Sequence, residues 1–440
     1  MKALTFRGGS HPFEGKDMSK DRKIREVLPK GLLVYPMSQH IGAPASPIVK
    51  AGERVLVGQK IGEAQGFVSA HVYSSVSGTV KAVEPRLTVS GAKVVSVVVE
   101  NDGQYEKAEG VGQKRNYEKL SKEDIRNYIK DAGVVGMGGA GFPTHIKLTP
   151  KDDSKIEYVI VNGAECEPYL TSDYRVMLEE PEKVIQGLKI ILKLFEHAKG
   201  IIAIEDNKPE AIEIMSKLVA NETNIQVKVL KTKYPQGAER QLIYATTGRA
   251  INSSMLPADA GCVVDNVDTV VAVNLAVCES TPVIRKIVTV TGDAIKTPQN
   301  FRVPTGLNYA ELVDEAGGFT TQPKKVVSGG PMMGMALYDL NVPVMKTSSA
   351  LLCMTRDEVA EFEPSACIRC GRCVEACPSH LIPQKMQEYS DRFDDAGFIA
   401  MNGMECYECG SCTYVCPAKR RLTQSFKQTR RSILDNRKKN

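Results

Sequence analysis

The sequence predicts a multidomain protein of mixed α/β and α+β architecture, and three observations support this prediction. The chain has 440 residues, which exceeds what one hydrophobic core normally organises, so roughly three or four domains are expected. Strand and helix patterns alternate between residues 118 and 280, as they do around a parallel sheet. Eight of the twelve cysteines stand in two identical runs near the C-terminus, which indicates a separate small module.

The first predicted domain, residues 1–115, consists of short strands broken by glycine. Residues 48–64 and 69–84 resemble the two halves of the lipoyl and biotinyl carrier fold, and this resemblance implies a barrel-sandwich hybrid domain. The carriers attach their cofactor to a lysine at a hairpin tip. The corresponding tip here is Gln65–Val68, and the nearest lysines are Lys60 and Lys81. We therefore expect a scaffold domain and no covalent carrier.

The second predicted domain, residues 116–282, alternates between helix and strand. Amphipathic periodicity predicts helices at 122–133, 181–196 and 208–222, and apolar β-branched runs predict strands at 155–162, 200–206 and 225–231. We expect a largely parallel sheet flanked by helices, an architecture that commonly carries a nucleotide site. The apolar run 270–277 has the length of a strand and is too short to cross a bilayer.

The third predicted domain, residues 283–350, combines strands with one helix. Residues 284–295 predict a strand and a turn, and Thr305 is a plausible N-cap for a helix over 308–318. This order over so short a stretch resembles the soluble-ligand-binding β-grasp domain.

The fourth predicted domain, residues 351–418, contains the two cysteine runs. Each has the spacing C-x2-C-x2-C-x3-C-P, and residues 382–400 between them predict a helix, which favours a helical ferredoxin module. Thiolates select iron-sulfur clusters, and zinc ribbons use paired C-x2-C motifs instead. In two-cluster ferredoxins the fourth cysteine of each run ligates the other cluster. We therefore expect two 4Fe-4S clusters, one held by Cys367, Cys370, Cys373 and Cys416 and the other by Cys406, Cys409, Cys412 and Cys377.

The compartment and the charge distribution follow from the chain ends. The N-terminus lacks the apolar region of a signal peptide, so we expect a reducing, cytoplasmic location that suits clustered thiolates. Residues 419–440 hold nine Lys or Arg against one acid, Asp435, although the whole chain carries only +5. This basic tail has two interpretations. It is either a solvated helical end, or a helix whose Leu422, Phe426 and Ile433 dock on a partner subunit or on anionic lipid.

A flavin is expected because clusters pass single electrons, whereas a nicotinamide donor gives a hydride. Gly136, Gly138 and Gly141 match G-x-G-x-x-G, but they follow a predicted helix where a Rossmann fingerprint follows a strand. Four segments are similar, in order, to motifs of the flavin-binding subunit of respiratory NADH dehydrogenase: GMGGAGFPTHIKL (136–148), NGAECEP (162–168), YPQGAERQL (234–242) and DNVDT (265–269).

This resemblance implies a site for FMN and NAD(H). It assigns Lys147 and Glu165 to the catalytic site, Lys147 as a cation for phosphate and Glu165 as a hydrogen-bonding partner of the nucleotide. The chain departs from the family at Met137, Ala164 and Ala238, where the family has an arginine, an aspartate and a glutamate. The implied cofactor-binding residues are Gly136, Gly138, Gly139, Gly141, Phe142, Lys147, Asn162, Glu165, Glu167, Tyr234, Gly237, Glu239, Asp265, Asn266 and Thr269.

The domain order, together with GGSHPFEGK at 8–16, resembles the C subunits of Rnf electron transport complexes. The resemblance implies an electron-input subunit that connects NADH and FMN, through the clusters, to other subunits of an ion-translocating ferredoxin:NAD oxidoreductase. It also implies a peripheral position on the cytoplasmic side of the membrane and no nucleic-acid partner. Two alternatives remain at this point: a soluble flavin and iron-sulfur reductase of the cobalamin reductase type, and a non-catalytic cluster-bearing scaffold whose basic tail binds membrane or nucleic acid.

Overall fold

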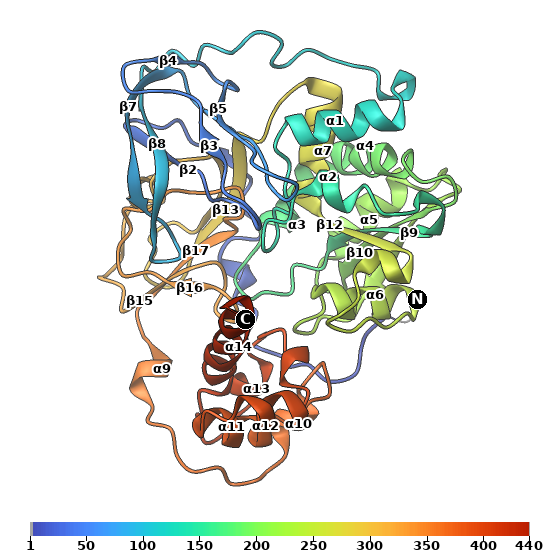
Figure 1. Ribbon diagram of the computed structural model, residues 1–440, viewed down its shortest axis with the longest axis vertical. Helices are drawn as coiled ribbons and strands as arrows, with labels where there is room; N and C mark the ends of the chain where they lie inside the picture. Colours follow the sequence, from blue (N-terminus) through green and yellow to red (C-terminus); the bar gives the residue numbers. More distant parts are fainter. Residues whose placement is uncertain (1–2, 440) are drawn as a thin grey trace.

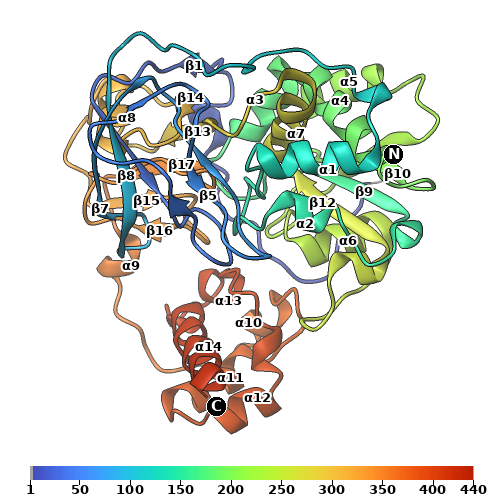
Figure 2. The ribbon, with the colours of Figure 1, turned by 45° about the horizontal axis from the view of Figure 1, so that its top comes forward.

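The computed structural model describes residues 3–439, in which two β-rich domains pack side by side and face an α/β domain (Figure 1). A helical module, coloured red, lies below all three (Figure 2). Short 3₁₀ turns occur at Lys16–Met18, Tyr117–Lys119, Asp153–Lys155, Pro257–Ala260 and Gly403–Glu405. Within residues 3–439, the helices all lack the combination of length and apolar composition that a membrane crossing requires.

The N-terminal domain is a sandwich of two small antiparallel sheets. One sheet has the order β2 (Leu32–Pro36), β8 (Lys93–Asn101), β7 (Gly78–Leu87) and β4 (Arg54–Val55), and the other has β3 (Ser46–Pro47), β5 (Lys60–Glu63) and β6 (Val72–Tyr73). Buried aliphatic side chains from both sheets, with Leu33, Val80 and Val97 among them, form one core. This is the barrel-sandwich arrangement predicted from the two glycine-broken halves.

The α/β domain is built on a four-stranded sheet in which every pairing is parallel. Its order is β11 (Ile225–Leu230), β10 (Lys199–Glu205), β9 (Tyr158–Gly163) and β12 (Cys262–Asn266). The chain leaves β9 toward β10 and β11 and returns on the opposite side with β12. The carboxyl ends of β9 and β12 therefore form a topological switch point, where ligands bind in such sheets.

Helices cover both faces of this sheet: α1 (Lys122–Asp131), α2 (Thr144–Lys147), α3 (Ser172–Glu179), α4 (Pro181–Leu192), α5 (Pro209–Leu218), α6 (Glu239–Thr247) and α7 (Val267–Glu279). The apolar run 270–277, which has the length of a strand, lies inside helix α7. Nearly all of α7 is buried, and a helix that is apolar on all sides loses the 3.6-residue periodicity that distinguishes it from a buried strand.

The β-grasp domain contains a six-stranded mixed sheet of order β1 (Arg25–Glu26), β14 (Gln299–Pro304), β13 (Arg285–Thr291), β17 (Ala350–Met354), β15 (Lys325–Ser328) and β16 (Met335–Ala336). Strand β1 comes from the N-terminal segment, and β17 continues the sheet beyond residue 350. The predicted cap Thr305 was wrong. Helix α8 (Tyr309–Glu315) is capped by Asn308, whose side chain accepts from the Ala310 amide, because Asn308 is the extended residue immediately before the first turn.

The C-terminal module is helical, as predicted, with α9 (Glu358–Glu361), α10 (Arg372–Glu375), α11 (Pro383–Asp391), α12 (Asp395–Ala400), α13 (Ser411–Tyr414) and α14 (Leu422–Lys439). The single helix predicted over 382–400 is two helices. Phe393 has a left-handed φ of 55°, which ends α11, and the Asp394 side chain caps α12.

The basic tail is helix α14, and its apolar side chains are already used inside the module. Leu422, Phe426 and Ile433 are buried in one core with Met386 and Phe398. The interpretation in which these three residues dock on a partner or on lipid is therefore wrong. The apolar spacing reflects packing of α14 against the cluster-bearing helices.

Candidate functional site

The glycine-rich segment 136–141 is a loop between α1 and α2, beside the switch point of the sheet. The Gly136 amide donates to the Phe142 carbonyl at 2.9 Å, and the Met137 amide donates to the Thr269 hydroxyl at 2.8 Å. A Cβ at Gly138 would lie 2.7 Å from the Asn266 side chain. The loop is thus fastened to the start of α7, and only glycine allows this approach at position 138.

Lys147, whose side chain is 20% exposed, and the buried Asp265 form an ion pair next to this loop. The Lys147 ammonium donates to Asp265 Oδ1 at 3.0 Å and to the Val264 carbonyl at 2.6 Å. Burial opposes the charge of Lys147, but the carboxylates of Asp265 and Glu239 together outweigh it, and the lysine pKa is raised. Burial also raises the pKa of Asp265. Asp265 Oδ2 is buried with no hydrogen-bond partner in the protein, so this atom can accept from a ligand hydroxyl.

The loops after β9 and β11 are joined at the same edge of the sheet. The Asn162 side chain donates to the Gly237 carbonyl at 2.9 Å, and the Gly237 amide lies 3.2 Å from Cys166 Sγ. Glu239 is the first residue of α6, and burial raises its pKa. The Gln236 side chain is buried, and neither of its polar atoms has a hydrogen-bond partner in the protein.

Glu165 and Glu167 have internal partners for their carboxylates. Glu165 adopts a left-handed φ of 48° and accepts from the Asp173 amide at 2.7 Å, which caps α3. Glu167 turns toward the β-grasp domain and accepts from the amides of Met332 and Met333 at 2.7 and 3.0 Å. The resemblance placed both acids on the flavin and nicotinamide side. In the structure, the Glu165 carboxylate bonds the start of α3, and the Glu167 carboxylate forms a contact between the α/β domain and the β-grasp domain.

Asp173 is a site residue that the sequence did not identify. Its carboxylate accepts from the Asn266 side chain at 2.6 Å, which joins α3 to the end of β12. Burial, with the Glu165 carboxylate as the next cause, raises the pKa of Asp173 to about 7. An acidic residue in the first turn of a helix is common, so its residue type gave no signal.

Tyr234 connects the α/β domain to the cysteine runs. Its hydroxyl donates to the Cys409 carbonyl at 2.7 Å, and its ring is buried. Two further contacts cross the same boundary: Gln241 donates to the Pro378 carbonyl at 2.7 Å, and Arg240 pairs with Glu405 at 2.9 Å. The edge of the sheet that carries the candidate site therefore faces the helical module.

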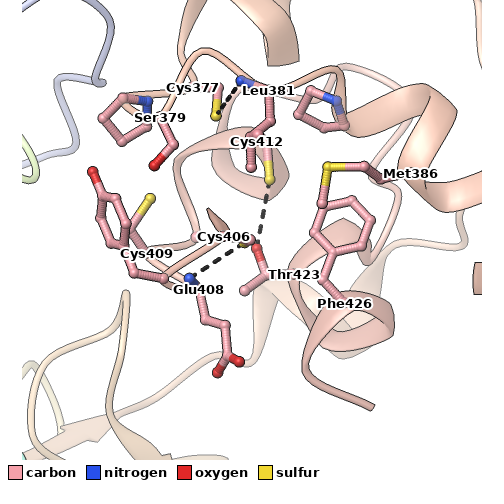
Figure 3. A pocket seen from close by; sticks show the side chains of 14 residues that line it. Cys377, Ser379, Leu381, Met386, Cys406, Glu408, Cys409, Cys412, Thr423 and Phe426 are labelled. Carbon is pink, nitrogen blue, oxygen red and sulfur yellow. Dashed lines mark hydrogen bonds between the residues drawn. The ribbon is translucent and has the colours of Figure 1, made fainter. Parts of the chain in front are cut away.

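Four cysteine side chains line one cavity of that module: Cys377, Cys406, Cys409 and Cys412. Figure 3 shows their sulfur atoms around this space, with Met386 and Phe426 on its apolar side. The Leu381 amide donates to Cys377 Sγ at 3.3 Å, and the Glu408 amide donates to Cys406 Sγ at 3.4 Å. Three members of the second run and the last member of the first thus lie together, with amides directed at sulfur as in iron-sulfur sites.

The other four cysteines of the two runs do not line this cavity. Cys367 and Cys370 are exposed, and Cys373 and Cys416 are half-buried. Among residues 3–439 there is no group of three or more His, Cys, Asp or Glu side chains close enough for a single metal ion. A cluster of four irons has its ligands distributed around a cube, and thiols on the walls of a cavity suit that shape.

Four family models match the chain in the predicted order. They are the RnfC barrel sandwich hybrid domain over residues 4–104, the Nuo51 FMN-binding domain over 129–275, the SLBB domain over 287–336 and the 4Fe-4S dicluster domain over 366–419. These matches confirm the predicted fold class and both expected cofactors, FMN and 4Fe-4S clusters. They also place a flavin-binding domain before the cluster module.

The solved structures include a distant likeness. In the crystal structure of NAD+-reducing [NiFe]-hydrogenase in the air-oxidized state, one chain matches with a TM-score of 0.50 and 20% identity. The match covers 72% of this protein and 64% of the hydrogenase chain, which is less than two thirds of the latter. At this identity the likeness concerns the fold alone.

Curated relatives match nearly the whole chain. The C subunit of the Na(+)-translocating ferredoxin:NAD(+) oxidoreductase complex of Acetobacterium woodii is 45% identical over 439 residues, covering 100% of this chain and 99% of the relative. Its proton-translocating counterpart from Clostridium ljungdahlii is 46% identical over 87% of this chain and 83% of the relative. The C subunit of the ion-translocating oxidoreductase complex of Rhodobacter capsulatus is 37% identical, with coverages of 97% and 82%. The chain therefore belongs to the RnfC family, the C subunits of ion-translocating oxidoreductase complexes.

Proposed function

We propose that this chain is the electron-input subunit of a membrane-bound Rnf-type complex, in which it connects NADH to partner subunits. The observation that carries this proposal is the contact between the two cofactor domains, where Tyr234 of the flavin domain donates to the carbonyl of Cys409. The complex would couple ferredoxin and NAD redox chemistry to ion translocation, and the translocating part would belong to other subunits. The soluble cobalamin reductase alternative is not favoured, because relatives named as complex subunits match the full chain.

The residues beside the glycine loop fit FMN. Bound FMN accepts a hydride from NADH and releases electrons one at a time. Lys147 would offer its ammonium to the FMN phosphate, the N-terminus of α6 would favour the same anion, and Asp265 Oδ2 would accept from a hydroxyl group. The other residues proposed for the flavin and nucleotide are Gly136, Gly138, Gly139, Gly141, Phe142, Asn162, Glu165, Glu167, Tyr234, Gly237, Glu239, Asn266 and Thr269.

Lys147 and Glu165 are proposed for the catalytic site, Lys147 at the FMN phosphate and Glu165 beside the nucleotide. Glu165 holds the start of α3 through its carboxylate, so its contribution is to fix the loop against which the nucleotide lies. Glu167 is proposed to contact the nucleotide less directly than Glu165 does, because its carboxylate already accepts hydrogen bonds from two amides of the β-grasp domain.

The two clusters are proposed to differ in position along the electron route. Cys377, Cys406, Cys409 and Cys412 would hold the inner cluster, because their cavity lies against the flavin domain. Cys367, Cys370, Cys373 and Cys416 would hold the outer cluster, whose first two ligands are exposed. Ile368 lies between those two ligands and is 65% exposed. We propose that this outer loop meets the electron-accepting subunit on the cytoplasmic side of the membrane.

Anaerobic purification tests the proposed function. We expect about eight irons and about eight sulfides per chain from two 4Fe-4S clusters, with one bound FMN and bleaching of the visible spectrum by NADH. Lys147→Gln should lose FMN because it removes the cation proposed for the FMN phosphate, whereas Lys155→Gln, at a lysine 76% exposed, should retain it. Iron without flavin, and a spectrum that NADH does not bleach, would refute the flavin relay.

A further inference from the structure

The N-terminal segment 8–19 runs from the cluster module to the flavin domain. At its start, the Gly9 amide donates to the Ala376 carbonyl at 2.9 Å, next to the inner-cluster ligand Cys377. Ser10 exchanges two main-chain hydrogen bonds with Tyr234, at 2.7 and 2.9 Å, and its hydroxyl lies 3.3 Å from that of Ser411. One short stretch thus contacts both walls of the boundary that electrons are proposed to cross.

At its other end, the segment holds the flavin-site loop through Lys16. The Lys16 ammonium donates to three main-chain carbonyls, at 2.8 Å to Glu165, 3.1 Å to Glu167 and 2.6 Å to Leu170. The ammonium is buried, and burial lowers its pKa. The Tyr169 amide also donates to the Glu14 carbonyl at 2.7 Å. A buried cation with three carbonyl partners requires those carbonyls to converge on one point, so it dictates the path of the loop.

The loop needs such a constraint because its backbone is strained. Glu165 and Tyr169 have φ values of 48° and 69°, in the left-handed region that is unfavourable for an L-residue. Such conformations persist only where the surroundings impose them. Lys16 bonds the carbonyl of Glu165 itself, and Glu14 bonds the amide of Tyr169. The segment therefore imposes both strained positions.

We propose that residues 8–19 act as a strap that positions the flavin-site loop against the inner cluster, with Lys16 as its positioning residue. The strap fixes the loop at one end and lies on the main chain of the Cys377 ligand at the other, so it sets the separation between the two cofactor sites. The kinetic consequence of this inference rests on the proposed function, whereas its structural consequence is independent of that function.

Lys16→Met tests the loop end of the strap in the full chain with FMN and clusters bound. Methionine keeps the apolar length but removes all three donors. We expect electrons from NADH to reach the clusters about 10- to 100-fold more slowly, as for a remote misplacement of reacting groups. Lys20→Met is the matched control, because Lys20 follows directly after the segment and pairs with Asp17 at the surface.

Gly8→Ala tests the cluster end and does not depend on Lys16. Gly8 has a φ of 87°, and an added Cβ would lie 2.8 Å from the Cys377 carbonyl oxygen. Gly52 has a φ of 91° with no atom within 4 Å of such a Cβ, so Gly52→Ala carries the same backbone strain without the contact. Gly8→Ala should slow cluster reduction and alter the electron paramagnetic resonance spectrum of one cluster. Gly52→Ala should do neither.

Amide hydrogen exchange gives a readout that needs no electron transfer. Lys16→Met should accelerate exchange of the amides in 165–170, and Lys20→Met should leave it unchanged. If NADH fails to reduce the wild-type clusters, the proposed function fails. The amide exchange measurement still tests whether the strap holds the loop. Unchanged exchange in Lys16→Met overturns the loop end of the strap, and unchanged cluster reduction and spectrum in Gly8→Ala overturn the cluster end.

Discussion

Asp268→Asn should destabilise the junction between the flavin domain and the β-grasp domain. Asp268 lies at the start of α7, and its carboxylate bonds the guanidinium of Arg285 at 2.6 Å and the ammonium of Lys286 at 2.8 Å, both on β13. Asp268 and Lys286 are almost fully buried. Burial alone would raise the pKa of Asp268, but the two cations outweigh it and hold that pKa far below its usual value.

The size of the effect follows from the charge left behind. Asparagine keeps the shape of Asp268 but leaves the buried Lys286 ammonium without a counter-charge, and breaking a buried pair in this way costs about 3–5 kcal/mol. For a cooperative unit of about 150–250 residues, this loss lowers the melting temperature by roughly 6–20 °C. Asp153→Asn is the control, because its pair with Arg126 is partly exposed and is worth about 1 kcal/mol or less.

Scanning calorimetry at pH 7 and at low pH provides the assay. Because the folded-state pKa of Asp268 lies below the unfolded value of about 3.9, the stabilisation is present above that pH and disappears as the pH falls through the folded pKa. The difference between wild type and Asp268→Asn should therefore shrink in acid. Adding Lys286→Met should recover part of the loss by removing the stranded charge. If Asp268→Asn lowers the free energy of unfolding at pH 7 by less than about 1 kcal/mol, the ion pair contributes no more than a surface pair does, and the reasoning is refuted.

Three further predictions concern the clusters, their docking and acid stability. Cys377→Ser should reduce bound iron from about eight to about four per chain, whereas Cys353→Ala, in β17 of the β-grasp sheet, should retain both clusters. Tyr234→Phe leaves the buried Cys409 carbonyl without its donor, at a cost of about 1–3 kcal/mol, and should lower the urea midpoint for loss of cluster absorbance. Burial lowers the pKa of His40 to about 4, so stability should fall as the pH falls from about 6.5 to about 4. His40→Gln should flatten that pH dependence in calorimetry.

The features of the fold that could be predicted from the sequence are those that depend on residues close together in the chain. The cysteine spacing predicted the module, and alternating periodicity predicted the parallel sheet, because ligand geometry and amphipathicity act over a few residues. Thr305 failed as a cap because residue type alone does not reveal which position is extended before a first turn. The run 270–277 in α7 and the apolar residues of α14 were ambiguous because burial on all sides, or against a distant helix, leaves no local trace.

The candidate site shows the same division between local and long-range information. Motif similarity predicted that Lys147, Asp265 and Asn266 would lie near the glycine loop, and the structure brings them together. It could not predict the partners of Glu165 and Glu167, because a motif specifies residue types but not the hydrogen bonds that each carboxylate makes. Asp173 and Lys16 act through contacts with residues far away in the sequence, so their residue types did not reveal these roles, although Lys16 lies in the segment 8–16 that supported the family resemblance.

The contacts of the N-terminal segment also bear on the order in which the protein is made. Ser10 meets Ser411, a residue 401 positions later, and Gly9 meets Ala376. A ribosome releases these first residues long before their partners exist, and domains generally fold as they emerge. The contacts of Gly9 and Ser10 with the cysteine module must therefore wait until nearly the whole chain has been synthesised, whereas Lys16 can meet residues 165–170 earlier. The contact between the N-terminal segment and the cysteine module is then among the last to form.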